Sequence, residues 1–349
     1  MKAAVLFETG KPLRILDDVE IPALLPGQVE VEIAYSGVCH SQLMEVRGKR
    51  GEDKFLPHLL GHEATGIVRA IGDGVNKVCP GDKVILGWIR GTGLEAAGAK
   101  YNWQGTHLNS GGITTFSERT VVSENRLTRL PEGLSMDLGV LFGCAIPTGA
   151  GMALNEIIIE PQHTVLIIGI GGIGAIALMY AKCKNPKNLI AVDVNPDKRK
   201  TALQLGATHA LDGSRDDILD QIRTLTDGKG ADYCLDAAGR TSTIELAFNA
   251  VRRQGGQCVF ASHPEAGQMI SIDPFELVNG KQIKGSWGGN TSPDRDLPHF
   301  YRMSVDNKLP LATMITRRYS LDKINDALDD LEAGAVMRPL LEINPAIDG

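Results

Sequence analysis

The chain has 349 residues, of which 43% are hydrophobic and 22% charged, and its 36 Lys and Arg against 42 Asp and Glu give a formal net charge of -6. This is the composition of an ordinary globular protein with enough apolar material for two domains. The acidic balance and the lack of long basic runs argue against non-specific binding to nucleic acid or to an anionic membrane. No apolar stretch approaches the roughly 20 residues needed to span a bilayer.

The cysteines and the N-terminus bear on the compartment. The six cysteines form no C-x-x-C pair and no dense framework, which in a chain of this size favours reduced thiols. The N-terminal residues have only a short apolar run and no small-residue cleavage pattern, so we expect no signal peptide. The sequence therefore predicts a cytoplasmic protein.

The first third of the chain is predicted to be rich in β-strands. Apolar and acidic residues alternate over 29–33, which is the period of a half-buried strand. Short apolar runs at 66–71, 83–86 and 116–122 are separated by Gly, Pro and Asp and predict further strands. The stretch 87–112 has no clear period, and we expect a long loop or lobe there.

From about residue 160 apolar strands alternate with helices. Strands are predicted at 164–168, 189–193, 207–211, 231–236 and 257–261, and helices at 173–183, 196–205, 216–226 and 242–251. Such alternation is typical of a parallel sheet covered by helices on both faces. After about residue 290 the rhythm fades, and only a helix at 321–333 and a strand at 339–343 are predicted.

The first predicted strand of this series runs into a glycine-rich turn. The turn has the pattern G-x-G-x-x-G and contains Gly169, Gly171, Gly172, Ile173 and Gly174. The first glycine allows a tight turn, the second lets the backbone approach a pyrophosphate, and the third permits close packing of helix on sheet. The following helix start offers free N–H groups to phosphates. We therefore expect a dinucleotide site rather than a plain glycine-rich turn.

Asp193, at the end of the next predicted strand, bears on the choice of cofactor. Its carboxylate can accept hydrogen bonds from the adenosine ribose and would repel a 2′-phosphate, so NAD is favoured over NADP. The basic residues Lys198, Arg199 and Lys200 follow closely and could contact a phosphate. For at least two of these three residues, a position on the solvent-exposed first turn of a helix is the favoured interpretation.

Three residues ahead of this region could bind a metal ion. Cys39, His62 and Cys144 supply two thiolates and one imidazole, which suit zinc. Three protein ligands would leave the fourth position for a substrate, as in catalytic zinc sites. The residues are scattered along the chain, so their spacing alone does not establish a site.

Several motifs together resemble those of the zinc-dependent alcohol dehydrogenases of the medium-chain dehydrogenase/reductase superfamily, over essentially the full length of the chain. The similar motifs are GVCHS at 37–41, GHEATGIV at 61–68, PGDKV at 80–84, GCAIPTGAG at 143–151, GIGGIG at 169–174 and GAT at 206–208. The resemblance implies that Cys39, His62 and Cys144 bind the catalytic zinc, with Glu63 as a nearby acidic residue that could adjust toward the metal.

The resemblance also implies roles for other residues. Ser41 matches the hydroxyl that hands on the substrate proton. His40 and Arg338 match positions that face the cofactor pyrophosphate, and Thr148 matches one beside the nicotinamide. Asp193 and Lys198 match the contacts to the adenosine ribose.

The chain departs from the family pattern in four places. The segment 87–112 contains no cysteine, which excludes the family's structural zinc of four clustered cysteines. Met44 stands where many members have the histidine that completes the proton relay, so the proton would have to leave Ser41 through the nicotinamide ribose and water, unless His40 or His58 substitutes. Gln42 replaces an acid often found behind the zinc ligand, and a neutral amide could still orient His62. Aromatic and basic residues of the lobe, Trp88 among them, could build specificity or form a surface loop.

Together these features predict an α/β protein of two domains. A catalytic domain resembling the partly open, GroES-like β-barrel is expected at 1–152 and 290–349, with a doubly wound Rossmann domain at 153–289 and the active site in the cleft at the carboxyl ends of the parallel strands. One catalytic Zn²⁺ per chain and NAD are expected, with a small alcohol or carbonyl substrate and a homodimer or homotetramer. Two alternatives are a zinc-independent reductase of activated alkenes and a non-catalytic nicotinamide-binding sensor or structural protein.

Overall fold

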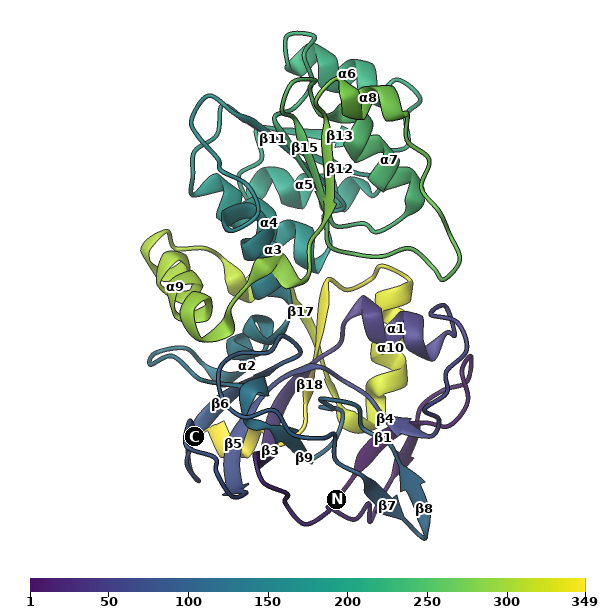
Figure 1. Cartoon of the computed structure of the whole chain (residues 1–349), viewed down its shortest axis with the longest axis vertical. Helices are drawn as coiled ribbons and strands as arrows, with labels where there is room; N and C mark the ends of the chain where they lie inside the picture. The colour runs from purple at the N-terminus through teal and green to yellow at the C-terminus, as the bar shows by residue number, and fades with distance from the viewer. Residues whose placement is uncertain (349) are drawn as a thin grey trace. The chain divides into compact units, whose positions relative to one another are not determined.

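The computed structural model describes residues 1–348, which form two compact units (Figure 1). The first unit comprises Met1–Cys144, Ser292–Arg302 and the C-terminal segment from Pro310, and the second comprises Ala145–Thr291 with Met303–Leu309. Helix α3 (Ala145–Leu154) lies in the second unit, which therefore begins before residue 153, where we predict the Rossmann domain to begin.

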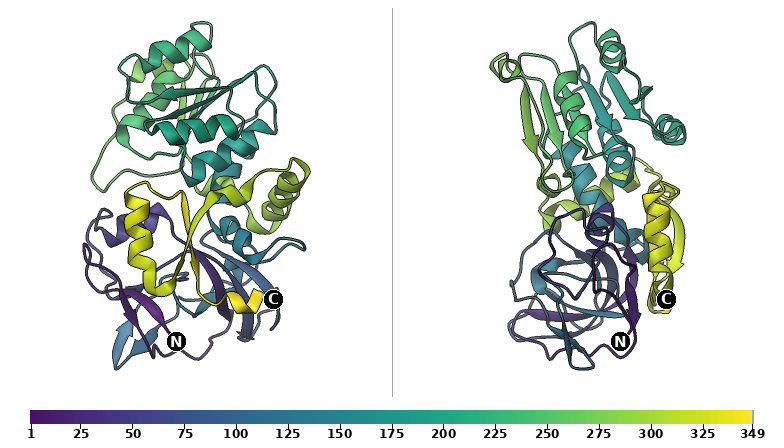
Figure 2. Two further views of the ribbon diagram at one scale, coloured as in Figure 1. Left: turned by 180° about the vertical axis from the view of Figure 1, so that it is seen from behind. Right: turned by 90° about the vertical axis from the view of Figure 1, so that its right-hand side faces the viewer.

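The first unit is built on a seven-stranded sheet that is antiparallel except for its last pair. The order is β10-β6-β5-β3-β18-β17, with β9 also paired to β3 and only β17 and β18 parallel. The views of Figure 2 show the yellow C-terminal strands beside the purple β3, which they join through β18. The strands are β3 (Gln28–Gly37), β5 (Glu63–Ile71), β6 (Lys83–Gly87), β9 (Arg119–Ser123), β10 (Leu127–Arg129), β17 (Ile315–Ser320) and β18 (Arg338–Glu342).

Strand β3 shows why the sheet forms. Val29, Val31 and Ile33 are fully buried, whereas Glu30 and Glu32 are half-buried and form ion pairs with arginines of neighbouring strands. The alternation predicted from the sequence is therefore present, with one face of the strand in the core and the other near solvent.

Two small sheets and short helices complete the first unit. The lobe expected at 87–112 contains a hairpin of two three-residue strands. Strands this short show no alternating pattern in the sequence, so they were not predicted. The elements are β1 (Ala3–Leu6), β2 (Arg14–Leu16), β4 (His58–Leu59), β7 (Tyr101–Trp103), β8 (Thr106–Leu108), α1 (His40–Val46), α2 (Met136–Gly139) and α10 (Ile324–Glu332).

The second unit contains a six-stranded sheet that is parallel throughout, in the order β13-β12-β11-β14-β15-β16. Every residue of β11 is buried, as expected for a strand covered on both faces. The elements are β11 (Thr164–Ile168), β12 (Asn188–Asp193), β13 (His209–Asp212), β14 (Tyr233–Asp236), β15 (Gln257–Phe260), β16 (Gln282–Gly285), α4 (Gly172–Lys182), α5 (Pro196–Gln204), α6 (Ile218–Leu225), α7 (Thr241–Ala250) and α8 (Pro274–Val278).

Several short elements of both units were not predicted from the sequence, and three in the C-terminal part of the chain show why. Strand β16 is a short, polar edge strand, so it lacks the apolar run of its neighbours. Helix α9 (Pro293–Asp306) contains Pro298 and many charged residues, and β17 is largely exposed. The two strands lack the apolar alternation on which the prediction depends. Helix α9 does bury one face, at Leu297 and Phe300, but a proline within the helix argues against a helix in the sequence.

Between residues 1 and 348 no single helix is long and apolar enough to cross a membrane. One bent pair of helices, Met136–Gly143 with Ala145–Leu154, meets that test by joint length and composition only.

Candidate active site

Four side chains of the first unit converge on one point. Cys39 precedes α1, His62 immediately precedes β5, Glu63 begins that strand, and Cys144 follows a short turn of 3₁₀-helix. One ligand atom from each lies within 4.8 Å of all the others. The structure thus brings together every residue that the sequence predicts as a metal ligand.

Two glycines make room for this cluster. A Cβ atom on Gly37 would lie 2.7 Å from the Glu63 carboxyl carbon, and one on Gly143 would lie 2.8 Å from Glu63 Cβ. Contacts this short would force the cluster apart. The glycines that precede the two cysteines of the cluster in the motifs therefore have a packing role.

The environment of Cys39 favours its thiolate. A hydrogen bond with Cys144 lowers the pKa of the Cys39 thiol well below its usual range, and His62 and Arg338 act in the same direction against the effect of burial. A thiolate is the form of cysteine that binds a metal ion. The cluster is therefore suited to a cation.

His62 is oriented by residues of α1. Gln42 Nε2 lies 2.5 Å from His62 Nδ1, and Ser41 Oγ lies 3.4 Å from the same atom. Gln42 Oε1 and His62 Nε2 are both buried and have no hydrogen-bond partner among residues 1–348. With the amide turned over, Oε1 accepts from Nδ1–H and leaves the lone pair on Nε2 for a metal ion. The residues therefore fit zinc.

Glu63 is paired with Arg338 inside the first unit. Arg338 Nη2 donates to both carboxylate oxygens of Glu63, and both side chains are buried. Burial raises the pKa of Glu63, while Arg338 opposes this effect. Arg338, predicted to face a pyrophosphate, thus has its guanidinium beside the metal cluster, and its role toward the cofactor stays a prediction.

The other histidines near α1 differ in exposure. His40 is exposed at the start of the helix. His58 is buried, with Nδ1 2.9 Å from the Leu59 carbonyl oxygen and Nε2 2.8 Å from Asp53 Oδ2. Both ring nitrogens of His58 are thus engaged, which disfavours it as the substitute for the missing relay histidine.

The predicted lobe contributes one aromatic residue near the cluster. The ring centroid of Trp88 lies 6.5 Å from that of His62. Tyr101, in contrast, is fully buried, and its hydroxyl oxygen accepts a hydrogen bond from the Val121 N–H. Of the two, only Trp88 is placed to border the cluster.

The glycine turn of the second unit lies between β11 and α4. Gly169 has φ of +84°, and a Cβ atom there would lie 2.8 Å from Ala238. A Cβ atom on Gly174 would lie 1.9 Å from the Gly169 carbonyl oxygen, whereas one on Gly171 would meet no atom within 4 Å in the described chain. Gly169 and Gly174 are therefore required by packing, and Gly171 leaves the backbone open to a ligand. Half-buried Gly172 and Ile173 begin α4.

Asp193 joins this turn to the end of β12. Its Oδ2 accepts from the Ile170 N–H at 2.7 Å, and its Oδ1 accepts from the Asn195 N–H at 2.9 Å. Each carboxylate oxygen retains a second lone pair for a ribose hydroxyl. Lys198 is half-buried on α5, and Arg199 forms an ion pair with Asp212.

Thr148 lies on α3 of the second unit. Its hydroxyl is buried and has no hydrogen-bond partner within the part of the chain that the structure describes. A buried hydroxyl without a partner is costly unless a ligand completes it. Thr148 therefore fits a role in binding a polar group of the cofactor.

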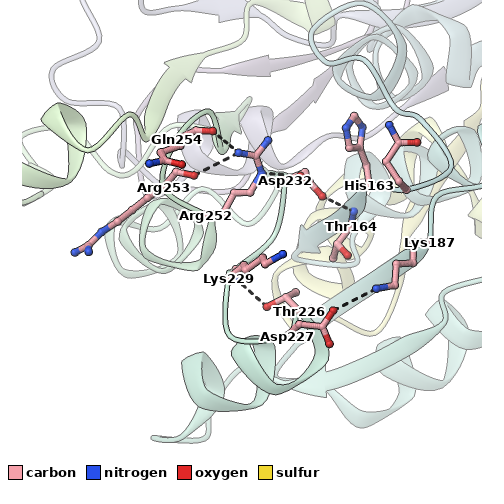
Figure 3. Close-up of a pocket in the computed structure, with 12 residues that line it drawn as sticks. His163, Thr164, Lys187, Thr226, Asp227, Lys229, Asp232, Arg252, Arg253 and Gln254 are labelled. Atoms are coloured by element: carbon pink, nitrogen blue, oxygen red, sulfur yellow. Dashed lines mark hydrogen bonds and ion pairs between the residues drawn. The ribbon is translucent and has the colours of Figure 1, made fainter.

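A polar cavity of about 730 Å³ lies elsewhere in the second unit (Figure 3). It is lined at Thr164, where β11 begins, whereas the glycine turn follows the other end of that strand. Its charges are partly paired internally, for example Arg252 with Asp232 at 2.7 Å. Its position separates it from the dinucleotide turn.

A thiolate and imidazole metal cluster and a glycine turn on a parallel sheet define a metal-dependent dehydrogenase that binds a dinucleotide. Residues 25–132 match the family model for the alcohol dehydrogenase GroES-like domain, and residues 172–303 match that for a zinc-binding dehydrogenase. The chain is 31% identical to an S-(hydroxymethyl)glutathione dehydrogenase of Synechocystis, over 97% of this chain and 99% of that protein.

Solved structures agree with this assignment. A benzyl alcohol dehydrogenase from Acinetobacter calcoaceticus superimposes with a TM-score of 0.88 and 27% identity, covering 98% of this chain and 99% of that one. An alcohol dehydrogenase from the archaeon Aeropyrum pernix gives 0.81 and 30%, covering 98% and 100%. The chain belongs to the zinc-dependent alcohol dehydrogenase family of the medium-chain dehydrogenase/reductase superfamily. The predicted fold class is confirmed, and the protein is an oxidoreductase that uses zinc and NAD.

Proposed function

We propose that this chain interconverts a small alcohol and its aldehyde or ketone, with Cys39, His62 and Cys144 as the zinc ligands. The observation that carries the proposal is the convergence of these ligand atoms within 4.8 Å. Zinc, when bound, acts as a Lewis acid that lowers the pKa of an alcohol and polarises a carbonyl. Glu63, held by Arg338, is an adjustable neighbour rather than the proton acceptor.

The chain's own residues orient the reaction and move the proton. Gln42 fixes the ring of His62, and the Ser41 hydroxyl, 3.4 Å from His62 Nδ1, is placed beside the ligand set to receive the substrate proton. His40, exposed at the start of α1, is proposed to face the pyrophosphate together with Arg338, as the family resemblance implies. Trp88, whose ring centroid lies 6.5 Å from that of His62, borders the ligand set.

In the second unit the backbone holds the dinucleotide. The free N–H groups at the start of α4, next to Gly171, Gly172 and Ile173, bind the pyrophosphate, and the Thr148 hydroxyl binds beside the nicotinamide. Asp193 accepts from the ribose, and Lys198 is proposed to contact the same ribose. The domain limits that we propose for these functions, 1–152 with 290–349 and 153–289, stay a prediction.

The test measures metal and turnover together. We expect the zinc-loaded protein to reduce NAD with members of an alcohol panel that includes benzyl alcohol and S-(hydroxymethyl)glutathione, the compounds after which two of the relatives are named. Cys144→Ser should abolish turnover yet still bind NADH, because the nucleotide contacts come from other residues. Turnover of an activated alkene without zinc would favour the zinc-independent reductase, and NADH binding without any turnover would favour a sensor.

We also propose that the protein is a homo-oligomer that associates through the β16 edge of the sheet. Trp287 and Val278, on either side of this edge strand, are each 80% exposed, and edge strands with apolar neighbours favour pairing with a second copy. Light scattering should give a dimer or tetramer, and Val278→Glu should lower the mass. Leu25→Glu, on the first unit, is the matched control that should not.

The state of the cysteines favours the cytoplasm. All six are free in the described residues, and two of them are proposed zinc ligands, which suits a reducing compartment. Fractionation of cells that produce the protein should recover it with the cytoplasmic fraction, and recovery in an oxidising compartment would contradict the assignment.

A further inference from the structure

Asp236 is a buried acid at the carboxyl end of a central strand of the parallel sheet, the same end of the sheet at which the glycine turn begins. It is the last residue of β14 and pairs in register with Ile168, the residue before Gly169. Its side chain is 0% exposed, and its Oδ2 accepts from the Gly239 N–H at 3.0 Å. Its Oδ1 is buried with no hydrogen-bond partner in residues 1–348. Neither the metal cluster nor the proposed cofactor contacts account for this carboxyl group.

The turn that Asp236 holds supports the glycine turn. The Ala237 N–H donates to the Ile168 carbonyl oxygen at 2.8 Å, and the space beside Gly169 is filled by Ala238, 2.8 Å from where a Cβ atom would stand. Gly239, whose N–H donates to Asp236, has φ of +70°, a left-handed backbone conformation that favours glycine. The Asp236 carboxyl thus fixes the surface against which the phosphate-binding backbone packs.

The surroundings of Asp236 favour its neutral form. Burial raises its pKa to about 6, against hydrogen bonds from Gly239, Thr243 and Ala238. The titratable groups facing it are the thiols of Cys234 and Cys258, which burial keeps neutral by raising their pKa, that of Cys258 to about 12. Across residues 1–348 no ion pair reaches Asp236, so only a proton can neutralise it.

We propose that Asp236 is a proton-linked positioning residue for the pyrophosphate of the dinucleotide, which binds most tightly when this carboxyl is neutral. The inference rests on the proposed dinucleotide site. A pyrophosphate on the glycine turn brings negative charge to the same carboxyl end of the sheet, where an ionised and buried Asp236 would repel it. Binding therefore raises the pKa of Asp236 further, and affinity falls as pH rises above about 6, the value at which the free carboxyl ionises.

Calorimetry with ADP-ribose on the zinc-loaded protein tests this. ADP-ribose carries the pyrophosphate but no nicotinamide, so the metal cluster does not contribute to the measurement. Between pH 5 and 8 we expect its Kd to rise about tenfold, which corresponds to one unit of further pKa increase on binding. Asp236→Asn keeps a side-chain acceptor without a titrating proton, so its Kd should stay flat with pH and near the low-pH value of the unmodified protein.

Two further variants separate positioning from charge. Asp236→Ala removes both the acceptor for the Gly239 N–H and the titrating charge, so its Kd should not vary with pH and should lie about tenfold above the low-pH value of the unmodified protein, the scale of one lost hydrogen bond. Asp220→Asn, an exposed acid on α6 paired with Arg223, is the matched control and should keep the pH dependence. Circular dichroism and thermal unfolding establish that each variant is folded.

The outcomes are distinct. The same pH dependence in Asp236→Asn as in the unmodified protein, or unweakened binding in Asp236→Ala at pH 5, would overturn the inference. Binding of ADP-ribose that does not vary with pH overturns the inference while the dinucleotide site stands. Failure of the unmodified protein to bind ADP-ribose at any pH would overturn both.

Discussion

Arg338 and Glu63 form a buried ion pair between residues 275 positions apart in the chain. Arg338 opens β18 and Glu63 opens β5, and one guanidinium nitrogen donates to both carboxylate oxygens. The same guanidinium lies near enough to Cys39 to favour its thiolate. The pair therefore places one positive and one negative group directly beside the proposed zinc ligands.

The first prediction breaks this pair. Arg338→Met should lower the free energy of unfolding by about 3–5 kcal/mol, because it leaves the Glu63 charge buried without a partner. Urea unfolding of the zinc-loaded protein measures the loss. Adding Glu63→Gln to the same chain removes the uncompensated charge and should restore part of the stability. A single variant as stable as the unmodified protein would show that the carboxyl is neutral in the folded state.

The second prediction concerns metal content. Elemental analysis should find about one zinc per chain, since a catalytic site takes three protein ligands and the segment 87–112 has no cysteine for another site. Cys144→Ser should lose most of this zinc, whereas Cys79→Ser, at an exposed cysteine outside the cluster, should retain it. Two zincs per chain, or an active protein without zinc, would refute the proposed site.

The third prediction concerns the choice of cofactor. Asp193→Gly removes the repulsion of a 2′-phosphate, so the ratio of kcat/KM for NADP over that for NAD should rise at least about tenfold. The structure adds a second effect, because Asp193 also accepts from the Ile170 N–H of the glycine turn. Asp193→Asn keeps an acceptor and removes the charge, and it should shift the ratio with less loss of overall activity. A preference for NADP in the unmodified protein would contradict this assignment.

The sequence predicts these sites unequally, for a physical reason. The glycine turn could be predicted because its residues are contiguous and its spacing follows from how a strand, a turn and a helix pack. The metal ligands Cys39, His62 and Cys144 come from separate elements, so only the family resemblance connected them. The partner of Arg338 depends on the pairing of β18 with β3, which no local pattern indicates.

Asp236 illustrates a further limit of sequence analysis. An Asp at the end of a predicted strand suggests a surface residue at a turn, and burial is visible only once neighbouring strands are placed. The half-buried strand at 29–33 was predictable because the alternation of apolar and polar residues shows which face of a strand is buried. Edge strand β16, with its exposed polar residues, has no such alternation.

The last prediction concerns the proton relay. Met44, half-buried on α1, lies three residues after Ser41, so the two side chains are neighbours on one face of the helix. A histidine is absent at this position, and the proton that Ser41 receives must leave through the cofactor ribose, His40 or solvent. Ser41→Ala should therefore lower alcohol oxidation by about 10²-fold or more, the usual scale of lost acid–base assistance.

Met44→His tests the same route by adding a base. An imidazole next to Ser41 should raise kcat for oxidation at pH values around its own pKa of about 6.5, where it begins to accept a proton. In Met44→Gln, a control of similar size that cannot titrate, the pH profile should not change. If Met44 only packs beside the substrate, both variants will raise KM without raising kcat. Unchanged oxidation in Ser41→Ala would show that the proton leaves by a path that does not include this hydroxyl.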